Sequence, residues 1–254
     1  MDSFLTLVSP LHLVLAMLIG LLAGTVKGVT GFAMPMILIS GLSSFLPPEM
    51  ALSALILPTL VTNLWQSLRQ GVSAAFASVR RYRGFLIAGL IALLISAQLV
   101  RVLPSAWLYL LIGGPITIFA ILQLRGWTPR FAPNAAIELA IGTFAGFIGG
   151  LSGVWGPPTV AYLTALNTPK AESMRVQGVI YGLGSVALFA AHLRSGVLRA
   201  ETLPLSVIMI VPAVAGMWVG LRIQDRFDQA TFRKVTLAVL LVAGANLIRR
   251  GVFA

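Results

Sequence analysis

The sequence contains one glycine- and proline-bearing motif twice, once in each half of the chain. The first copy, AGTVKGVTGFAMP, starts at Ala23, and the second, AGFIGGLSGVWGP, starts at Ala145. The copies align without a gap and match at Ala23/Ala145, Gly24/Gly146, Gly28/Gly150, Thr30/Ser152, Gly31/Gly153 and Pro35/Pro157. A glycine-rich interruption of apolar sequence that recurs in both halves is typical of the binding site of a secondary transporter.

The scarcity of charged residues indicates that the chain lies in a membrane. Only 10% of the 254 residues are charged and 58% are hydrophobic, whereas a soluble domain carries roughly 25% charged residues. We therefore predict an all-α polytopic protein of the cell (inner) membrane, surrounded by the lipid bilayer. The net charge of +11 comes from Arg and Lys in short loops, where they orient membrane helices, so we expect no nucleic-acid partner.

Apolar segments follow the order short, short, long, long, long in each half. They are expected at 11–23, 35–46, 50–68, 85–102 and 106–124, and again at 136–148, 157–168, 171–193, 203–221 and 231–248. We take 1–130 as the first repeat and 131–254 as the second, pseudo-symmetric repeat, together forming one transmembrane domain. Segments 35–46 and 157–168 would each make roughly 18 Å of helix, too short to cross a hydrocarbon core of about 30 Å.

Each pair of short segments can be arranged in two ways. A re-entrant hairpin leaves three crossings per half and makes the repeats inverted. A single broken helix leaves four crossings per half and makes the repeats parallel. The hairpin arrangement places more Arg and Lys on the inner side, which the positive-inside rule favours. We therefore predict inverted repeats, with loop 69–83 inside, and with loop 194–201 and both termini outside.

The break between the short segments is the candidate substrate site. Gly31 and Gly153 each precede a proline by four residues. Glycine permits a left-handed backbone, and proline favours the first turn of a helix, so one helix ends and another begins at each break. The unpaired N–H groups and positive dipole end of that second helix would suit an anion. Gly28 and Gly150 adjoin the breaks, although their GxxxG spacing from Gly24 and Gly146 also allows close helix packing.

Several polar side chains add candidate ligands. Lys27 is the one charged residue of the first motif; it would either attract the substrate or snorkel to the interface. Thr30 and Ser152 would either donate to a ligand or bond the local backbone. Asn63 and Gln66 would line the cavity or join helices. The predicted substrate-binding residues are Lys27, Gly28, Thr30, Gly31, Asn63, Gln66, Gly150, Ser152 and Gly153.

The sequence carries no recognisable catalytic or metal-binding machinery. It has no cysteine and two histidines, so thiolate sites and a histidine-built metal centre are excluded. No Asp or Glu lies deep in a long segment, which argues against a carboxylate proton relay. Walker-type phosphate loops and HExxH pairs are also missing. We expect no enzymatic activity and no cofactor.

These features resemble the TauE/SafE sulfite-exporter family over nearly the whole chain. The resemblance rests on the paired motif, the short segment after each copy, Asn63, and the triplet Arg69-Gln70-Gly71, which returns as Arg194-Ser195-Gly196. It implies a polytopic transporter built by duplication that exports or takes up sulfite, sulfonates and related small anions. The first motif, Lys27-Gly28-Val29-Thr30-Gly31, departs from the denser glycine run of many members.

We therefore expect a secondary transporter, an exporter of small sulfur-containing organic or inorganic anions. One alternative is a carrier for another small metabolite, either a carboxylate or a neutral molecule. The other is a membrane scaffold without transport activity. The doubled break favours transport, because a scaffold has no need of irregular backbone at membrane depth.

Overall fold

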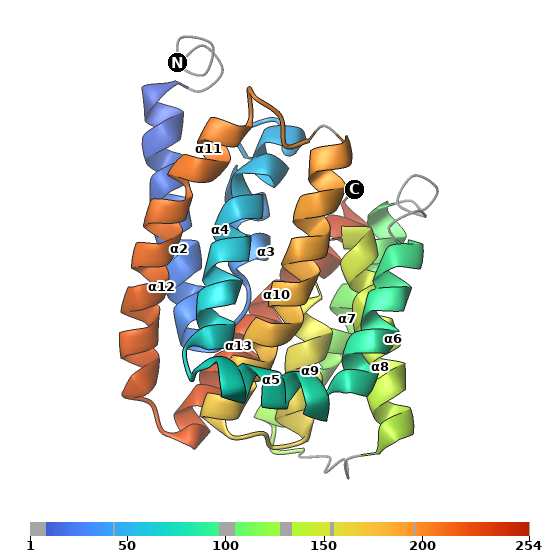
Figure 1. Ribbon diagram of the computed structural model, residues 1–254. Helices are drawn as coiled ribbons and strands as arrows, with labels where there is room; N and C mark the ends of the chain where they lie inside the picture. Colours follow the sequence, from blue (N-terminus) through green and yellow to red (C-terminus); the bar gives the residue numbers. More distant parts are fainter. Residues whose placement is uncertain are drawn as a thin grey trace. The chain divides into compact units, whose positions relative to one another are not determined.

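The computed structural model describes residues 9–42, 44–96, 105–127, 134–152, 155–195 and 197–253. These residues form α-helices joined by turns, and no strand occurs among them (Figure 1). The helices are α2 (Pro10–Thr30), α3 (Met34–Leu42), α4 (Pro48–Leu68), α5 (Val72–Arg81), α6 (Arg83–Ser96), α7 (Ser105–Leu124), α8 (Ala135–Ser152), α9 (Gly156–Ala165), α10 (Lys170–Ser195), α11 (Leu203–Ile208), α12 (Ile210–Asp225) and α13 (Gln229–Val252).

The chain divides into two compact units, and each combines segments from both halves of the sequence. Unit 1 contains Met1–Arg69 and Gly178–Arg226, and unit 2 contains Gln70–Gln177 and Phe227–Ala254. Helix α10 therefore contributes its C-terminal part to unit 1 and its N-terminal part to unit 2. The helices do not pack as the sequence halves 1–130 and 131–254, and the repeat relation between those halves stays a prediction.

Helix α2 extends beyond the apolar segment 11–23 and ends at the break predicted at Gly31. It continues to Thr30 because Gly24 and Gly28 do not interrupt it but pack against α12. A Cβ on Gly24 would lie 2.2 Å from the carbonyl oxygen of Ala213, so only glycine allows this approach. At this length α2 can cross a membrane, as can Met50–Leu68, Leu203–Asp225 and Gln229–Val252 among the described helices.

The chain turns back after α2 and makes a hairpin within unit 1. Gly31 ends α2 with a φ of 88°, the left-handed conformation predicted for the break. Gly41, near the end of α3, lies against Ile19 of α2. The ring of Phe45 lies 5.1 Å from the ring of His12, at the start of α2. The segment after the break therefore runs antiparallel to α2, as in the hairpin arrangement and unlike a single broken helix.

Helices α4 and α12 run in the same direction in unit 1 (Figure 1). Near one end, Ser206 of α11 accepts a hydrogen bond from the N–H of Leu57 and donates one of 2.6 Å to the carbonyl of Ser53. At the other end, Arg69 and Asp225 form an ion pair of 2.6 Å. Arg69 and the loop that precedes α11 therefore lie at opposite ends of unit 1.

Unit 2 contains a second pair of helices in glycine-mediated contact. Helices α6 and α8 run parallel, and a Cβ on Gly146 would lie 1.9 Å from the carbonyl oxygen of Gly89. One turn earlier, Gly142 contacts the backbone of Phe85. Helix α9 follows α8 after a short break and begins with Pro157 in its first turn. Close packing accounts for Gly146, as it does for Gly24 and Gly28 of unit 1.

Candidate functional site

Lys27 lies inside unit 1, in the last turn of α2. Its side chain is 1% exposed, and its Nζ donates a hydrogen bond to Oδ1 of Asn63 on α4. Among the described residues, no carboxylate pairs with Lys27. Snorkelling would leave the ammonium group exposed at one end of the helix, whereas here the side chain is buried.

The side-chain amide of Asn63 is held in one orientation. Its Nδ2 donates to the carbonyl of Tyr181 at 3.1 Å and to Oγ of Ser185 at 3.3 Å, both on α10. Because both donors of the amide nitrogen are used, the amide oxygen faces Lys27. Helices α2, α4 and α10 therefore meet at Asn63.

Asn63 and Ser185 occupy matched positions of the two halves of the sequence. They are separated by 122 residues, the same separation as between the two copies of the motif. Gly178 contacts Ser67, while Ser185 contacts Asn63, so α4 and α10 run antiparallel where they meet. Ser185 is not among the predicted substrate-binding residues; its separation from Asn63 is the signal that pairs them.

Two further side chains of α4 cover the break after α2. Gln66 donates through Nε2 to the carbonyl of Gly31 at 3.1 Å, an acceptor that the end of the helix leaves without a helical partner. Thr62 donates to the carbonyl of Pro58 at 2.7 Å and lies 3.9 Å from the sulfur of Met34. One face of α4 thus contacts both the end of α2 and the start of α3.

The structure brings four of the predicted site residues together in unit 1: Lys27, Gly31, Asn63 and Gln66. We call these residues with Ser185 the Lys27 cluster. Thr30, by contrast, donates its hydroxyl to the carbonyl of Val26 at 2.9 Å, the local bond that is the alternative to a ligand contact. Gly28 faces α12, where a Cβ would lie 2.4 Å from the carbonyl oxygen of Met217.

The second copy of the motif lies in unit 2. Gly150 and Ser152 belong to the last turns of α8, although their surroundings lie outside the described part of the chain, as does Gly153 altogether. Gly149 stands where the first copy has Lys27, and a Cβ on it would lie 2.7 Å from the Trp155 ring. A side chain would collide with that ring, so this position has no room for a second lysine.

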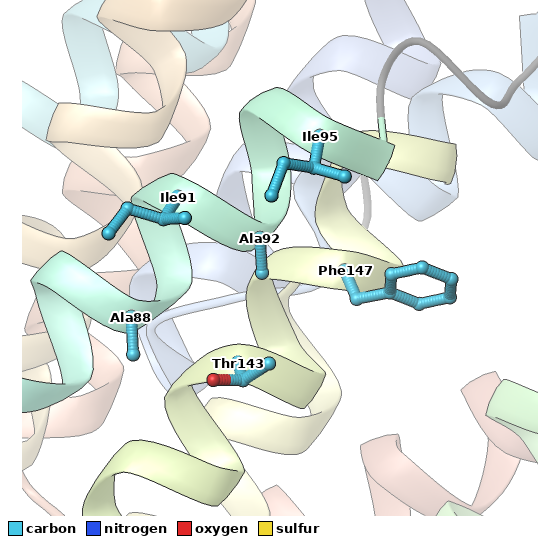
Figure 2. Close-up of a pocket in the computed structure, with 6 residues that line it drawn as sticks. All are labelled: Ala88, Ile91, Ala92, Ile95, Thr143 and Phe147. Atoms are coloured by element: carbon cyan, nitrogen blue, oxygen red, sulfur yellow. The ribbon is translucent and has the colours of Figure 1, made fainter.

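Unit 2 also contains an apolar hollow of about 370 Å³ between α6 and α8 (Figure 2). It is lined by Ala88, Ile91, Ala92, Ile95, Thr143 and Phe147. The hydroxyl of Thr143 is the one polar side-chain group in this lining. Without a charged side chain, the hollow offers little to a small anion, which needs donors or positive charge to replace its water.

The electrostatics of the Lys27 cluster suit a negatively charged ligand. Removing one ion from water costs several kcal/mol unless an opposite charge or hydrogen bonds replace the water. The Asn63 oxygen satisfies one donor of Lys27 but carries no compensating charge. An anion beside Lys27 would supply both the charge and further hydrogen-bond acceptors.

A scan against protein families identifies the kind of protein that holds this cluster. The model of the family described as sulfite exporter TauE/SafE matches residues 16–247. The chain belongs to the TauE/SafE family. Searches of curated proteins and of solved structures each found no match. Membership in TauE/SafE confirms the resemblance seen in the sequence and indicates a multi-pass membrane transporter.

Proposed function

We propose that this TauE/SafE protein is a secondary transporter that exports small sulfur-containing anions, such as sulfite or sulfonates, and that the Lys27 cluster binds them. The observation that carries the proposal is Lys27 itself. Its side chain is 1% exposed and bonds the neutral amide of Asn63, with no carboxylate partner among the described residues. In a membrane protein, an ionisable side chain that is buried among the helices is a functional candidate by default.

Small oxyanions match the hydrogen-bonding capacity of this lysine. A charged lysine has three N–H donors, and Asn63 takes one of them. The remaining donors can serve two oxygens of a sulfite or sulfonate group. A ligand bound in this way would offset the charge of Lys27, which lowers the cost of holding both away from water.

We also propose that the two halves are inverted repeats and that the cluster lies near their axis. Two antiparallel helices that touch at matched positions, as α4 and α10 do at Asn63 and Ser185, are what a twofold axis in the membrane plane would produce. The hairpin of α2 and α3 supports the same arrangement. Transporters with inverted repeats bind substrate near the repeat interface.

The direct test replaces Lys27 and measures transport in proteoliposomes. Sulfite, methanesulfonate, taurine and acetate are supplied in turn, so that transport of the sulfur-containing substrates can be compared with transport of a carboxylate. Lys27→Met removes the charge but keeps an unbranched side chain, and should weaken sulfite binding by at least about tenfold, or about 1.4 kcal/mol. Lys27→Glu should abolish transport by repulsion, while Lys27→Arg keeps the positive charge and serves as the matched control.

Two outcomes would decide against the proposal. Unchanged sulfite affinity in a stably folded Lys27→Met variant would remove the cluster from the binding site. Transport of acetate in preference to the sulfur-containing anions would favour the carboxylate carrier, because Lys27 could bind either kind of anion.

A further inference from the structure

Helix α5 presents apolar side chains and arginines on the side that unit 2 leaves exposed. Val72 and Phe76, one turn apart, are 72% and 62% exposed. Residues four apart lie on one face of a helix, so these two form a continuous stripe. Arg80 extends the same row by one turn, and Arg81 beside it is also exposed.

The opposite side of α5 is fixed to the start of α10. Ala75 and Ser78 are buried, and Oγ of Ser78 accepts a hydrogen bond of 2.8 Å from Nε of Arg175. Arg175 also donates to Oε1 of Gln70, whose Nε2 donates to the carbonyl of Ala171 at 2.7 Å. These contacts hold α5 in one rotation, which keeps the Val72 and Phe76 stripe pointing away from α10.

The arginines at the end of α5 lack acidic partners among the described residues. Arg80, Arg81 and Arg83 are exposed, and none of them forms an ion pair with a described carboxylate. The carboxylate of Glu172, close to this end of α5, instead lies 3.5 Å from the hydroxyl of Tyr82. Three positive charges without carboxylate partners, beside an apolar stripe, are complementary to phosphates at the surface of a bilayer.

The chain also keeps α5 close to the bilayer. The membrane-length helix ending at Leu68 precedes it by a few residues, and the apolar helix α6 starts at Arg83, directly after Tyr82. A short amphipathic helix with a polar, basic side lies in the membrane interface, with its apolar residues in the acyl boundary. Unit 2 leaves uncovered the surface that such an interfacial helix buries in lipid.

We propose that α5 is an interfacial anchor for anionic phospholipids: Val72 and Phe76 enter the acyl boundary, and Arg80, Arg81 and Arg83 bind headgroup phosphates. The anchor is separate from the transport site, because it requires neither Lys27 nor a transported anion. The positive-inside rule says only on which side of the membrane a basic loop lies. The proposed anchor also assigns one face of α5 to one class of lipid.

Site-directed fluorescence in nanodiscs tests this anchor, and the absence of native cysteine makes the labelling specific. An environment-sensitive dye is attached to Phe76→Cys and, as a control on the same helix, to Ala77→Cys, which is exposed but lies off the stripe. The nanodiscs contain phosphatidylcholine with increasing fractions of phosphatidylglycerol. We expect the dye at position 76 to shift to the blue and to be quenched by lipid-attached spin labels as phosphatidylglycerol increases, while the dye at position 77, in the row of Arg81 and off the apolar stripe, shifts and is quenched less.

The charge dependence is tested by changing Arg80, Arg81 and Arg83 together to Gln in the Phe76→Cys background. Each basic residue near an anionic surface contributes to lipid attraction, so the phosphatidylglycerol fraction at the midpoint should rise at least about threefold. Inorganic phosphate at constant ionic strength should not reproduce the shift, which separates a lipid from a free phosphate ligand. A dye at position 76 that remains in water at every lipid composition would overturn the proposal, as would an unchanged midpoint in the glutamine variant.

Discussion

The bond between Lys27 and Asn63 holds a buried lysine that has no carboxylate partner in the described part of the chain. The partner is an amide, which accepts one hydrogen bond and leaves the charge uncompensated. The amide cannot rotate away, because Tyr181 and Ser185 hold its nitrogen. A carboxylate in place of Asn63 would neutralise the lysine within the protein and compete with an external anion.

A double-mutant cycle should measure this coupling. Asn63→Leu removes the partner of Lys27 and should lower the free energy of unfolding by about 1–3 kcal/mol, because a buried donor is left unsatisfied. Adding Lys27→Met should restore part of that loss, so the two effects are not additive. Thermal and chemical unfolding in detergent give the values. Additive losses would mean that the two side chains do not interact.

Gly31 is the residue whose backbone conformation makes the hairpin turn. Its φ of 88° is costly for any residue with a Cβ, on the order of 1–3 kcal/mol. Gly31→Val should therefore remove sulfite flux while membrane insertion and yield remain close to wild type. Gly153→Val applies the same change to the second copy of the motif. Normal flux in both variants would show that the two breaks do not form the site, and would leave the side chains of Thr62, Asn63 and Gln66 on α4 as the candidate substrate contacts.

At the scale of elements, the contact of α2 with α12 and that of α6 with α8 depend on the absence of side chains. Glycine in a helix costs about 1 kcal/mol relative to alanine, so its presence at these positions has a packing reason. In both contacts the carbonyl oxygen of the neighbouring helix occupies the place of a Cβ. Separating the helices would lose van der Waals contacts, which are a main source of association energy in a bilayer.

Alanine substitution should distinguish packing glycines from the others. Gly24→Ala and Gly146→Ala would place a Cβ 2.2 Å and 1.9 Å from carbonyl oxygens and should lower both thermal stability and yield. The matched control is Gly114→Ala in α7, where a Cβ would meet nothing within 4 Å; it should be neutral or gain up to about 1 kcal/mol. Equal melting temperatures for Gly24→Ala and Gly114→Ala would contradict the close approach of α2 and α12.

At the scale of the whole molecule, the direction of two helices of unit 1 distinguishes the two proposed topologies. In unit 1, α4 and α12 run in the same direction, so Arg69 and the loop before α11 lie at opposite ends. If α4 and α12 each cross the bilayer, these two places face opposite sides of the membrane. Inverted repeats require this result, whereas parallel repeats place both on one side.

Cysteine accessibility in intact cells should show this sidedness. Ala200→Cys, exposed in the loop before α11, should react with an impermeant maleimide from the outside. Ser73→Cys, exposed at the start of α5, should react only after the cells are opened. Both variants rest on a chain without native cysteine. Protection of Ala200→Cys in intact cells and its labelling in opened cells would support broken helices and parallel repeats.

Local features of the sequence were sufficient to predict three things: the class of helical membrane proteins, the family, and the turn at Gly31. Membrane helices are apolar over their whole length. Glycine followed by proline predicts the end of one helix and the start of the next without any knowledge of tertiary contacts. Lys27 and Asn63 could likewise be selected one at a time, because a polar group at membrane depth is exceptional. None of these signals states which residues touch.

Tertiary packing decided the role of Gly24 and Gly28 and the pairing within the cluster. Glycine in a sequence is equally compatible with a helix end and with a close contact, and only α12 beside Gly24 and Gly28 makes it a contact. Whether the Lys27 side chain is buried or reaches the interface depended in the same way on where Asn63 lies. A lysine near the end of a membrane helix snorkels to the interface unless an acceptor inside the protein binds its ammonium group. Both outcomes come from groups distant in the sequence, which local pattern cannot place.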